Sequence, residues 1–409
     1  MDVFGIDREV DSPRCPAAER SRTANKNGTS TLHGLTLPPS AQFLRYVVDV
    51  ADRYKDAGVR DQGDALSAVA RHLGPTLSFP HNAEILTDFG HYAAVIKVRD
   101  DMAIAICTDG VGSKTVIASE LDRYDTIGFD CMAMNVNDLI CVGARPLAMV
   151  DYLGVHTLDP NRVDQILQGL GAAAKEAGVA VPGGELAQLP DVIGSDGTGD
   201  GDPKSFDLVG TSIGTLHPQD LMLGNEIAAG DVLIGLRSSG LHSNGFTLAR
   251  RVLREAGFRY QDDLPRLGCT LGDELLRPTE IYVRAVVGMW NEGVETTGAA
   301  HITGDGLLNL SRLQPAVGYS LDNLPEPQPI FELISEAGNI SPAEMYRVFN
   351  MGIGFIVVTR PDVEGAALDA LQARGHDVQR VGTVTDEAGV VRIERAELSG
   401  NLESGFSPA

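Results

Sequence analysis

The chain has 409 residues, of which 43% are hydrophobic and 22% charged, and its formal net charge is −23. This length is sufficient for two domains with substantial cores, and the strong acidity excludes non-specific binding to nucleic acid or to anionic membranes, because both attract basic surfaces. No apolar run approaches the roughly 18 residues of a membrane span. The first residues, "MDVFGIDREVDSP", carry acids where a signal peptide carries Lys or Arg, so we expect a cytoplasmic protein.

The chain begins with a polar, aperiodic stretch over residues 1–40, which predicts a disordered tail. Helical periodicity follows between Tyr46 and Val69, with an interruption around "DAGVRDQGD". The segment "YAAVIKVRDDMAIAICTDG" contains two apolar runs separated by "RDD" and predicts a hairpin. Ala133 to Val142 is an apolar run that predicts a buried helix.

The next segments predict further strands and helices. "LAMVDYLGV" and "FDLVGTSIGTL" predict strands, and "NRVDQILQGLGAAAKEAG" predicts a helix that ends at Gly. A second unit starts with "GDVLIGLRSSGLHSNGFTLARRVLREAG", a strand, a Gly and Ser turn and a helix. We therefore expect an α/β fold with an N-terminal domain over residues 41–216, a C-terminal domain over 217–396 and a second tail over 397–409.

The five cysteines contain no C-x-x-C pair. Cys107, Cys131 and Cys141 lie in apolar segments, where a free thiol behaves as a small hydrophobe. We expect these three to pack in the core.

The stretch "CTDGVGSK" lies at the end of an apolar run and opens onto a helical segment. Asp109 in it is a hard carboxylate that can hold Mg²⁺. Gly110 and Gly112 let the backbone approach an anion, while Lys114 supplies a point charge. The stretch is not a Walker A loop, and an ordinary turn with a surface lysine is the alternative.

The following segment, "FDCMAMNVNDLICVGARPLAMVDYL", places polar side chains in an apolar sequence. Buried carboxylates are costly unless they are paired or bind metal, and residues three apart share a helix face. The pattern predicts oxygen ligands for Mg²⁺ and a nucleotide, with a capping set at a helix end as the alternative. The polar residues are Asp130, Asn135, Asn137 and Asp138.

Three further stretches carry candidate catalytic residues. "SSGLHSNGF" precedes a helix whose N-terminus favours negative charge, and His242 in it is a candidate for substrate phosphate or proton handling. A capping turn with an incidental histidine is the alternative. His301 in "AHITGDG" is a second proton-transfer candidate. Glu185 in "GGELAQLP" is a candidate for orienting the substrate or binding metal, with a plain salt bridge as the alternative.

These stretches also carry a family resemblance. "YKDAG", "TDGVGSK", "GGELAQLPDVI", "LHSNGFTLARRVL", "AHITGDG" and "EMYRVFNMGIGF" occur in the order found in phosphoribosylformylglycinamidine cyclo-ligases, also called aminoimidazole ribonucleotide synthetases. The chain resembles the archaeal-type members of this family from about Tyr46 to Arg395.

The resemblance implies a fold and a reaction. The fold is two α/β domains, in which the N-terminal domains of two subunits join in a β-barrel-like dimer core and ATP binds without a P-loop. The reaction converts formylglycinamidine ribonucleotide and ATP into 5-aminoimidazole ribonucleotide, ADP and phosphate through an iminophosphate, in purine biosynthesis. No nucleic acid or membrane partner is expected.

The implied chemistry is phosphoryl transfer, which depends on positioning and charge neutralisation. We expect Lys114, His242, His301 and Glu185 to act in catalysis. Mg²⁺ is expected on Asp109 with Asp130 or Asp138. The candidate nucleotide-binding residues are Asp109, Gly110, Gly112, Ser113, Lys114, Asn135, Asp138, Ser243 and Asn244.

Two residues depart from the family pattern. Leu186 stands where the family usually has Thr, and Asp305 stands where it usually has the middle Gly of "TGGG". We expect Asp305 to repel a phosphate at this turn unless Mg²⁺ or an arginine intervenes. Two alternatives stay open: an ATP-dependent enzyme of the same superfamily with a changed substrate, and a non-catalytic nucleotide-binding paralogue.

Overall fold

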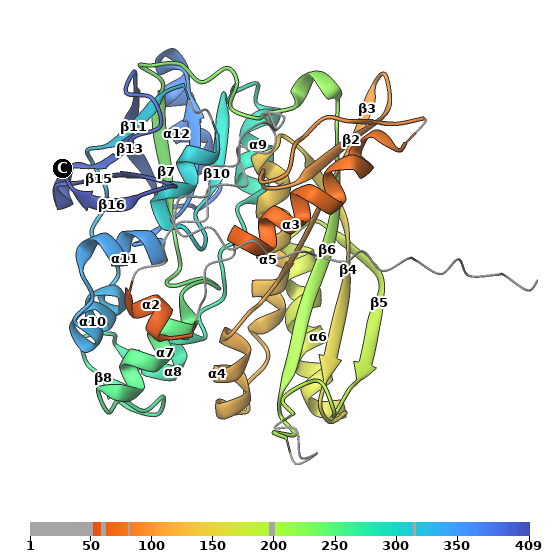
Figure 1. The fold of residues 1–409 in the computed structure, drawn as a ribbon, viewed down its shortest axis with the longest axis vertical. Helices are drawn as coiled ribbons and strands as arrows, with labels where there is room; N and C mark the ends of the chain where they lie inside the picture. The colour runs from red at the N-terminus through yellow and green to blue at the C-terminus, as the bar shows by residue number, and fades with distance from the viewer. Residues whose placement is uncertain (1–51, 59–62, 81, 196–200, 314–315) are drawn as a thin grey trace, which may run out of the picture. The chain divides into compact units, whose positions relative to one another are not determined.

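The computed structural model describes residues 52–58, 63–80, 82–195, 201–313 and 316–409. The expected tail over 1–40 lies outside these ranges. Within them, the chain builds two large sheets in succession, each with its own helices (Figure 1). This agrees with the expected α/β class. We call residues 52–216 the first half and residues 217–409 the second half.

The first half is built on one sheet with the strand order β1-β2-β3-β6-β4-β5. Neighbouring strands are antiparallel, except that β4 and β5 are parallel. The pair β2 and β3 is the expected hairpin. The strands are β1 (Glu84–Ile85), β2 (Ala94–Arg99), β3 (Met102–Gly110), β4 (Arg145–Val155), β5 (Ala180–Gln188) and β6 (Phe206–Leu216).

Two long helices, α5 (Ile127–Cys141) and α6 (Pro160–Ala177), pack together against this sheet (Figure 1). The expected buried helix is the C-terminal part of α5, which is almost entirely buried. Helix α6 begins where the sequence predicts, because the Asp159 carboxylate accepts hydrogen bonds from the first backbone amides and Gly178 ends the helix at φ +73°. The shorter helices are α2 (Asp52–Asp56), α3 (Gly63–Leu73) and α4 (Lys114–Leu121).

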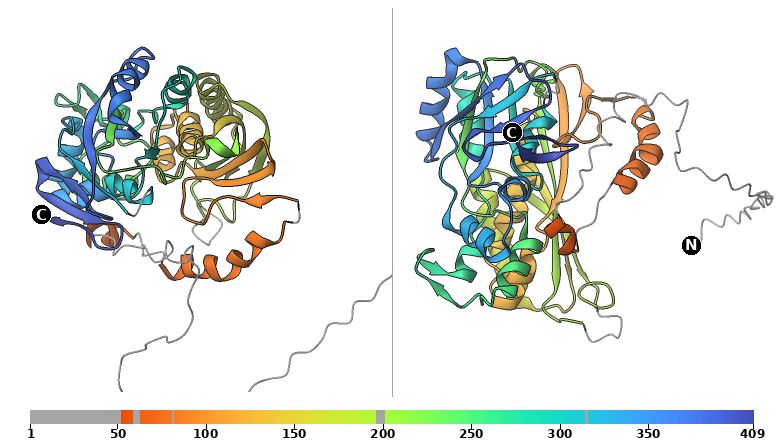
Figure 2. Two further views of the ribbon diagram at one scale, coloured as in Figure 1. Left: turned by 90° about the horizontal axis from the view of Figure 1, so that it is seen from above. Right: turned by 60° about the vertical axis from the view of Figure 1, so that its left-hand side comes forward.

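The second half is built on a sheet with the order β10-β12-β7-β13-β11-β14-β15-β16, and Figure 2 draws the fold from two further sides. Its interior strands β7 and β12 are almost entirely buried. The strands are β7 (Val232–Arg237), β10 (Gly298–His301), β11 (Gly318–Leu321), β12 (Ile353–Thr359), β13 (Val378–Thr385), β14 (Val391–Ile393), β15 (Leu398–Asn401) and β16 (Gly405–Pro408). The helices are α7 (Phe246–Glu255), α8 (Leu271–Leu275), α9 (Val283–Asn291), α10 (Pro329–Gly338), α11 (Pro342–Val348) and α12 (Glu364–Gln372). A small separate hairpin joins β8 (Asp263–Leu264) and β9 (Cys269–Thr270).

The expected tail over 397–409 is instead part of this sheet. β15 pairs with β14, and β16 pairs with β15, both antiparallel. Leu398, Leu402 and Phe406 are buried, so the segment contributes to the core. With only three large apolar residues over nine positions, it showed too little periodicity to be recognised as two strands.

Part of the first sheet presents apolar side chains to solvent. On β4, Val150 and Tyr152 are 44% and 37% exposed, whereas the alternate residues Met149 and Leu153 are buried. Successive strand residues point to opposite faces, so one face of β4 packs on the helices and the other is open.

A close contact between α5 and α6 generates a first prediction. A Cβ added at Gly128 on α5 would overlap the backbone of Gly169 and Leu170 on α6. We expect Gly128→Ala to lower the free energy of unfolding by about 2–3 kcal/mol, because backbone atoms of a packed helix cannot move aside independently. The measurement is the urea denaturation midpoint.

Gly171→Ala on α6 is the matched control, because an added Cβ there has nothing within 4 Å. It should leave stability unchanged or raise it by up to about 1 kcal/mol. Equal midpoints for both variants would show that the two helices are not in tight contact.

Candidate active site

The backbone of Asp109 is held in place by an asparagine on α5. The Asp109 amide donates to Asn135 Oδ1 at 3.0 Å, and Asn135 Nδ2 donates to the Asp109 carbonyl at 3.0 Å. Asn135 Nδ2 also donates to the Cys131 carbonyl at 2.8 Å, and the asparagine is fully buried. We expected Asn135 to contact a nucleotide, but the structure uses all of these polar atoms to fix the end of β3. Asn135 therefore fixes the backbone position of Asp109.

Two carboxylates and a histidine meet at this point. Asp138 Oδ1 lies 2.8 Å from His301 Nδ1, and Cys107 Sγ lies 3.6 Å from Asp138 Oδ2. Burial, and then the neighbouring Asp138, raise the pKa of Asp109 to about 6, while the Gly110 amide and His301 oppose the rise. The structure thus brings together three of the expected residues, Asp109, Asp138 and His301, although they lie far apart in the sequence.

His301 ends β10 with its ring fully buried. An ionised carboxylate can only accept, so Nδ1 carries the proton donated to Asp138. Nε2 has no hydrogen-bond partner among the described residues. The ring is therefore oriented by one carboxylate and offers its second nitrogen for proton transfer.

Lys114 and Asp130 form an ion pair at 2.8 Å with no exposed side-chain surface. Lys114 Nζ also donates to the carbonyls of His242 and Arg277, at 3.2 and 2.5 Å. Asp130 Oδ1 accepts from the amide and hydroxyl of Thr279, at 2.8 and 2.6 Å. The expectations that Lys114 faces a phosphate and that Asp130 binds metal do not agree with this placement, because each charge already has a buried partner.

His242 is also placed differently from the expectation. It is 2% exposed and adopts φ +64°, which is unusual for a residue with a side chain. Its Nε2 accepts from the Ser239 amide at 3.2 Å. Burial, followed by the charges of His301 and Lys114, holds the pKa of His242 well below its ordinary range. The neutral ring shapes the turn from inside, which agrees with the capping alternative.

The glycine-rich loop before α4 lies beside the "SSGLHSNGF" turn. Ser113 Oγ is 3.0 Å from Thr247 Oγ1 at the start of α7, and Gly112 has φ +71°. Within the part of the chain that the structure describes, the amides of Gly112 and Ser113 have no hydrogen-bond partner. Two free amides at a helix N-terminus are suited to an anion. Across from them, Ser243 Oγ lies 3.1 Å from Thr279 Oγ1, and Asn244 Nδ2 lies 3.9 Å from Met134 Sδ.

Glu185 is not brought to this site. In the sheet, Asp109 pairs with Gly210 on β6, Gly210 pairs with Asp151 on β4, and Asp151 pairs with Gly184 on β5. Glu185 therefore lies three strands from Asp109, about 14 Å at the usual strand spacing. It pairs with the exposed Tyr152, and Leu186 beside it is 46% exposed.

Asp151 in the same row was missed by the sequence reasoning. Burial raises its pKa, and a Cβ at Gly184 would overlap its carboxylate. The available signal was an acid in the middle of the apolar strand "LAMVDYLGV". An acid in a strand interior is unusual, so Asp151 could have been named as a candidate site residue together with the acids of α5.

The extra carboxylate at Asp305 has a partner. Arg312 Nη2 donates to Asp305 Oδ2 at 2.7 Å, so an arginine intervenes as the sequence analysis required. The pair neutralises the charge that the departure from glycine adds near His301.

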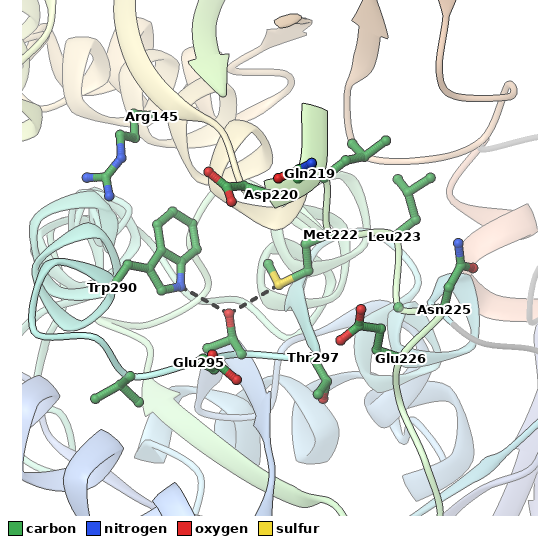
Figure 3. A pocket seen from close by; sticks show the side chains of 15 residues that line it. Arg145, Gln219, Asp220, Met222, Leu223, Asn225, Glu226, Trp290, Glu295 and Thr297 are labelled. Atoms are coloured by element: carbon green, nitrogen blue, oxygen red, sulfur yellow. Dashed lines mark hydrogen bonds between the residues drawn. The ribbon is translucent and has the colours of Figure 1, made fainter. Parts of the chain in front are cut away.

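A cavity of about 520 Å³ lies elsewhere, between the connection after β6 and the end of α9 (Figure 3). Its walls include Trp290, Met222 and Glu226, and none of the expected site residues lines it. Trp290 Nε1 donates to Thr296 Oγ1 at 3.0 Å, as the dashed line shows. The cavity is therefore separate from the Asp109, Asp138 and His301 cluster.

The buried ion pair generates a second prediction. We expect Lys114→Met to lower the free energy of unfolding by about 3–5 kcal/mol, because it leaves Asp130 charged and buried without its cation. The double variant Lys114→Met/Asp130→Asn removes that charge and keeps an oxygen for Thr279, so it should recover much of the loss. Chemical denaturation of both variants is the measurement. A Lys114→Met protein with unchanged stability but lost ATP binding would instead indicate that Lys114 contacts the nucleotide.

Comparisons with known proteins agree with the two-domain architecture. Residues 90–216 match the family described as AIR synthase related protein, N-terminal domain, and residues 228–394 match AIR synthase related protein, C-terminal domain. The phosphoribosylformylglycinamidine cyclo-ligase of Methanobrevibacter smithii is 45% identical over 337 residues, which are 82% of this chain and 95% of that protein. The same-named protein of Methanothermobacter thermautotrophicus is 45% identical over 344 residues, covering 83% and 96%.

Solved structures share the fold at low sequence identity. The HypE–HypF complex has a TM-score of 0.56 at 17% identity and covers 84% of this chain and 99% of its own. AaThiL complexed with AMPPCP and TMP has a TM-score of 0.53 at 14% identity, covering 81% and 92%. The curated relatives are similar over nearly their whole length, and both halves match the same family. The chain therefore belongs to the family of phosphoribosylformylglycinamidine cyclo-ligases.

Proposed function

We propose that this chain closes the imidazole ring of 5-aminoimidazole ribonucleotide, using ATP and formylglycinamidine ribonucleotide and releasing ADP and phosphate, in purine biosynthesis. The observation that carries the proposal is the 45% identity to named cyclo-ligases over more than 80% of the chain. The meeting of Asp109, Asp138 and His301 supports it, because it supplies charged and proton-transferring groups at one point.

The chemical difficulty is that an amide oxygen is a poor leaving group. Transfer of the γ-phosphoryl group of ATP to that oxygen forms an iminophosphate and releases ADP. The amidine nitrogen then attacks the same carbon, the C–O bond breaks, phosphate leaves, and one proton is lost as the ring forms. His301 Nε2 is the nitrogen that would accept that proton, because Nδ1 is held by Asp138.

The free amides of Gly112 and Ser113 are the proposed contacts for the ATP phosphates. They lie at the N-terminus of α4, next to the turn that contains Ser243 and Asn244. The structurally similar AaThiL was crystallised with AMPPCP, which supports nucleotide use by this fold. The proposed role of Lys114 is structural, because its amine bonds the backbone carbonyls of His242 and Arg277 and so fixes the loops that contain them.

The donor set at the site is suited to Mg²⁺. The described residues contain no group of three His, Cys, Asp or Glu side chains that could hold a metal. Asp109 and Asp138 provide two carboxylates, and burial together with the neighbouring Asp138 raises the pKa of Asp109. Mg²⁺ commonly takes one or two carboxylates and completes its shell with phosphate oxygens and water. When bound there it would neutralise phosphoryl charge, and Asp130 is not part of this set because Lys114 occupies it.

A homodimer is the proposed assembly. The open face of β4 exposes Val150 and Tyr152, and Glu185 on β5 pairs with Tyr152 and so lies on the same face. Two such faces would cover each other and place Glu185 at the interface, which gives Glu185 a location that the monomer leaves unexplained. No described helix is long and apolar enough to span a membrane, and a cytoplasmic location stays a prediction of the sequence.

The test of the function is ADP release by the purified protein with Mg-ATP, with and without formylglycinamidine ribonucleotide, alongside formation of the aminoimidazole product. We expect substrate-dependent ADP in equal amount to product. Asp109→Asn should keep the fold and lower turnover by about 100-fold or more, because it removes a charge from the phosphoryl-transfer site. ATP binding without either signal would point to a changed substrate or a non-catalytic paralogue.

The pH dependence of Mg-ATP binding is a sharper check of Asp109. Because its pKa is raised to about 6, the metal-free carboxylate becomes protonated as the pH falls below that value. Affinity at pH 5 should therefore be about tenfold lower than at pH 7, and Asp109→Asn should lose this dependence. Titration calorimetry at both pH values measures it, and an unchanged slope in the variant would remove Asp109 from the metal site.

The dimer generates a separate prediction. We expect Tyr152→Glu to shift the protein toward a monomer, because it buries a carboxylate in the apolar contact. Light scattering after size-exclusion chromatography is the measurement. Val192→Glu, at an exposed apolar residue beyond β5, is the control for surface charge, and a wild-type monomer would contradict the proposal.

A further inference from the structure

His301 is held through its backbone as well as through its ring. Tyr92 Oη donates to the His301 carbonyl at 3.2 Å and lies 3.4 Å from the Asn309 carbonyl. Tyr92 precedes β2 in the first half and is 6% exposed, whereas His301 and Asn309 belong to the second half. The phenol therefore ties the end of β10 to the sheet that carries Asp109.

The Tyr92 ring is in turn covered by an arginine. The Arg312 guanidinium lies over the ring at 5.7 Å from its centre, and its Nη2 donates to Asp305 Oδ2. Asp305 stands in the turn that follows β10, four residues after His301. The contacts thus form a closed loop. It runs from the His301 carbonyl to Tyr92 and Arg312, and then through Asp305 back along the backbone to His301.

The turn inside this path has its own support. Asn309 Nδ2 donates to the Gly306 carbonyl at 2.7 Å, and Thr303 Oγ1 donates to Asn309 Oδ1 at 3.3 Å. Gly306 adopts φ +55°, and a Cβ there would overlap the Tyr346 carbonyl. A displacement of Tyr92 or Arg312 would therefore be transmitted to the backbone of His301.

We propose that Tyr92, Arg312 and Asp305 form a bracket that positions His301 of the second half against Asp138 of the first half. This rests on the proposed function, in which the His301 ring accepts a proton. The three residues act through His301 and do not contact the reacting atoms. Within the bracket, the role of Asp305 is to hold the guanidinium over the Tyr92 ring.

The His301 ring has little to hold it in place apart from its own strand. Within the described residues the His301 ring has one hydrogen-bond partner, Asp138, at 2.8 Å. A shift of the strand end by 1 Å would lengthen that contact beyond hydrogen-bond range. The bracket resists such a shift, because Tyr92 of the first half bonds the backbone carbonyl of His301 itself.

The test compares Tyr92→Phe and Arg312→Ala with wild type. We expect kcat to fall about tenfold in each, with little change in the KM for ATP, because the nucleotide contacts lie on the α4 loop. Asp305→Asn should lose less, about threefold, since it keeps an oxygen acceptor for Arg312. Arg392→Ala is the matched control: it breaks the exposed Arg392–Glu387 pair on the same half and should leave kcat unchanged.

Chemical rescue separates positioning from loss of stability. Arg312 lines a second cavity of about 520 Å³, beside His91 and Leu313, which gives a small cation access to the space that Arg312→Ala creates. Millimolar guanidinium chloride should restore part of the kcat of Arg312→Ala, and sodium chloride at equal concentration should not. An unchanged kcat in Tyr92→Phe and Arg312→Ala, or a loss that follows thermal stability without rescue, would overturn the bracket.

A readout without turnover keeps this result distinct from failure of the proposed function. In protein labelled with ¹⁵N-histidine, the proton between His301 Nδ1 and Asp138 should give a low-field resonance, assigned by its absence in His301→Gln. We expect Tyr92→Phe to broaden or shift it and Arg392→Ala to preserve it. An unshifted resonance in Tyr92→Phe would refute the bracket even if the wild-type protein has no cyclo-ligase activity.

Discussion

The buried pair of Lys114 and Asp130 is the interaction on which the rest of the structure depends. It joins the first turn of α4 to the first turn of α5, and through two carbonyls it reaches the second half at His242 and Arg277. A charge pair without solvent is costly unless hydrogen bonds support it. Thr279 donates two hydrogen bonds to Asp130 Oδ1, whereas Oδ2 has no partner among the described residues. The glycine-rich loop, the histidine turn and the start of the long helix are therefore fixed at one point. The loop that we propose as the phosphate-binding site is built around this pair and does not include it.

The polar residues of α5 show how far the sequence could predict the site. Their presence in an apolar segment was sufficient to propose a site on this helix, because unpaired buried polar groups are rare. It was not sufficient to assign their roles. Asn135 fixes the backbone of Asp109, and Asn137 bonds the backbone of Glu280 and Tyr282 in the second half. Asp130 pairs with Lys114, and Asp138 pairs with His301. One helix thus serves two halves, and only three-dimensional contacts distinguish its supporting residues from its functional ones.

The fold followed from the sequence where periodicity was long and where end signals were clear. Helix α6 and the β2–β3 hairpin are examples, since each combines a regular apolar pattern with a cap or a turn. The strands β15 and β16 were missed because their burial depends on pairing with β14, a contact that no local pattern encodes. The contact of Tyr92 with Arg312 was equally invisible, because 220 positions of sequence separate the two residues. Long-range side-chain contacts of this kind define the site more than any single motif does.

The cavity at the end of α9 has a spectroscopic consequence. Trp290 in its wall is the single tryptophan of the chain. Its indole is bonded to Thr296, whose hydroxyl lies 3.2 Å from Met222 Sδ in the connection between the halves. The fluorescence of the unlabelled protein therefore comes from one indole that touches that connection and lies away from the nucleotide loop. We therefore expect a ligand that moves one half against the other to change the emission of this indole.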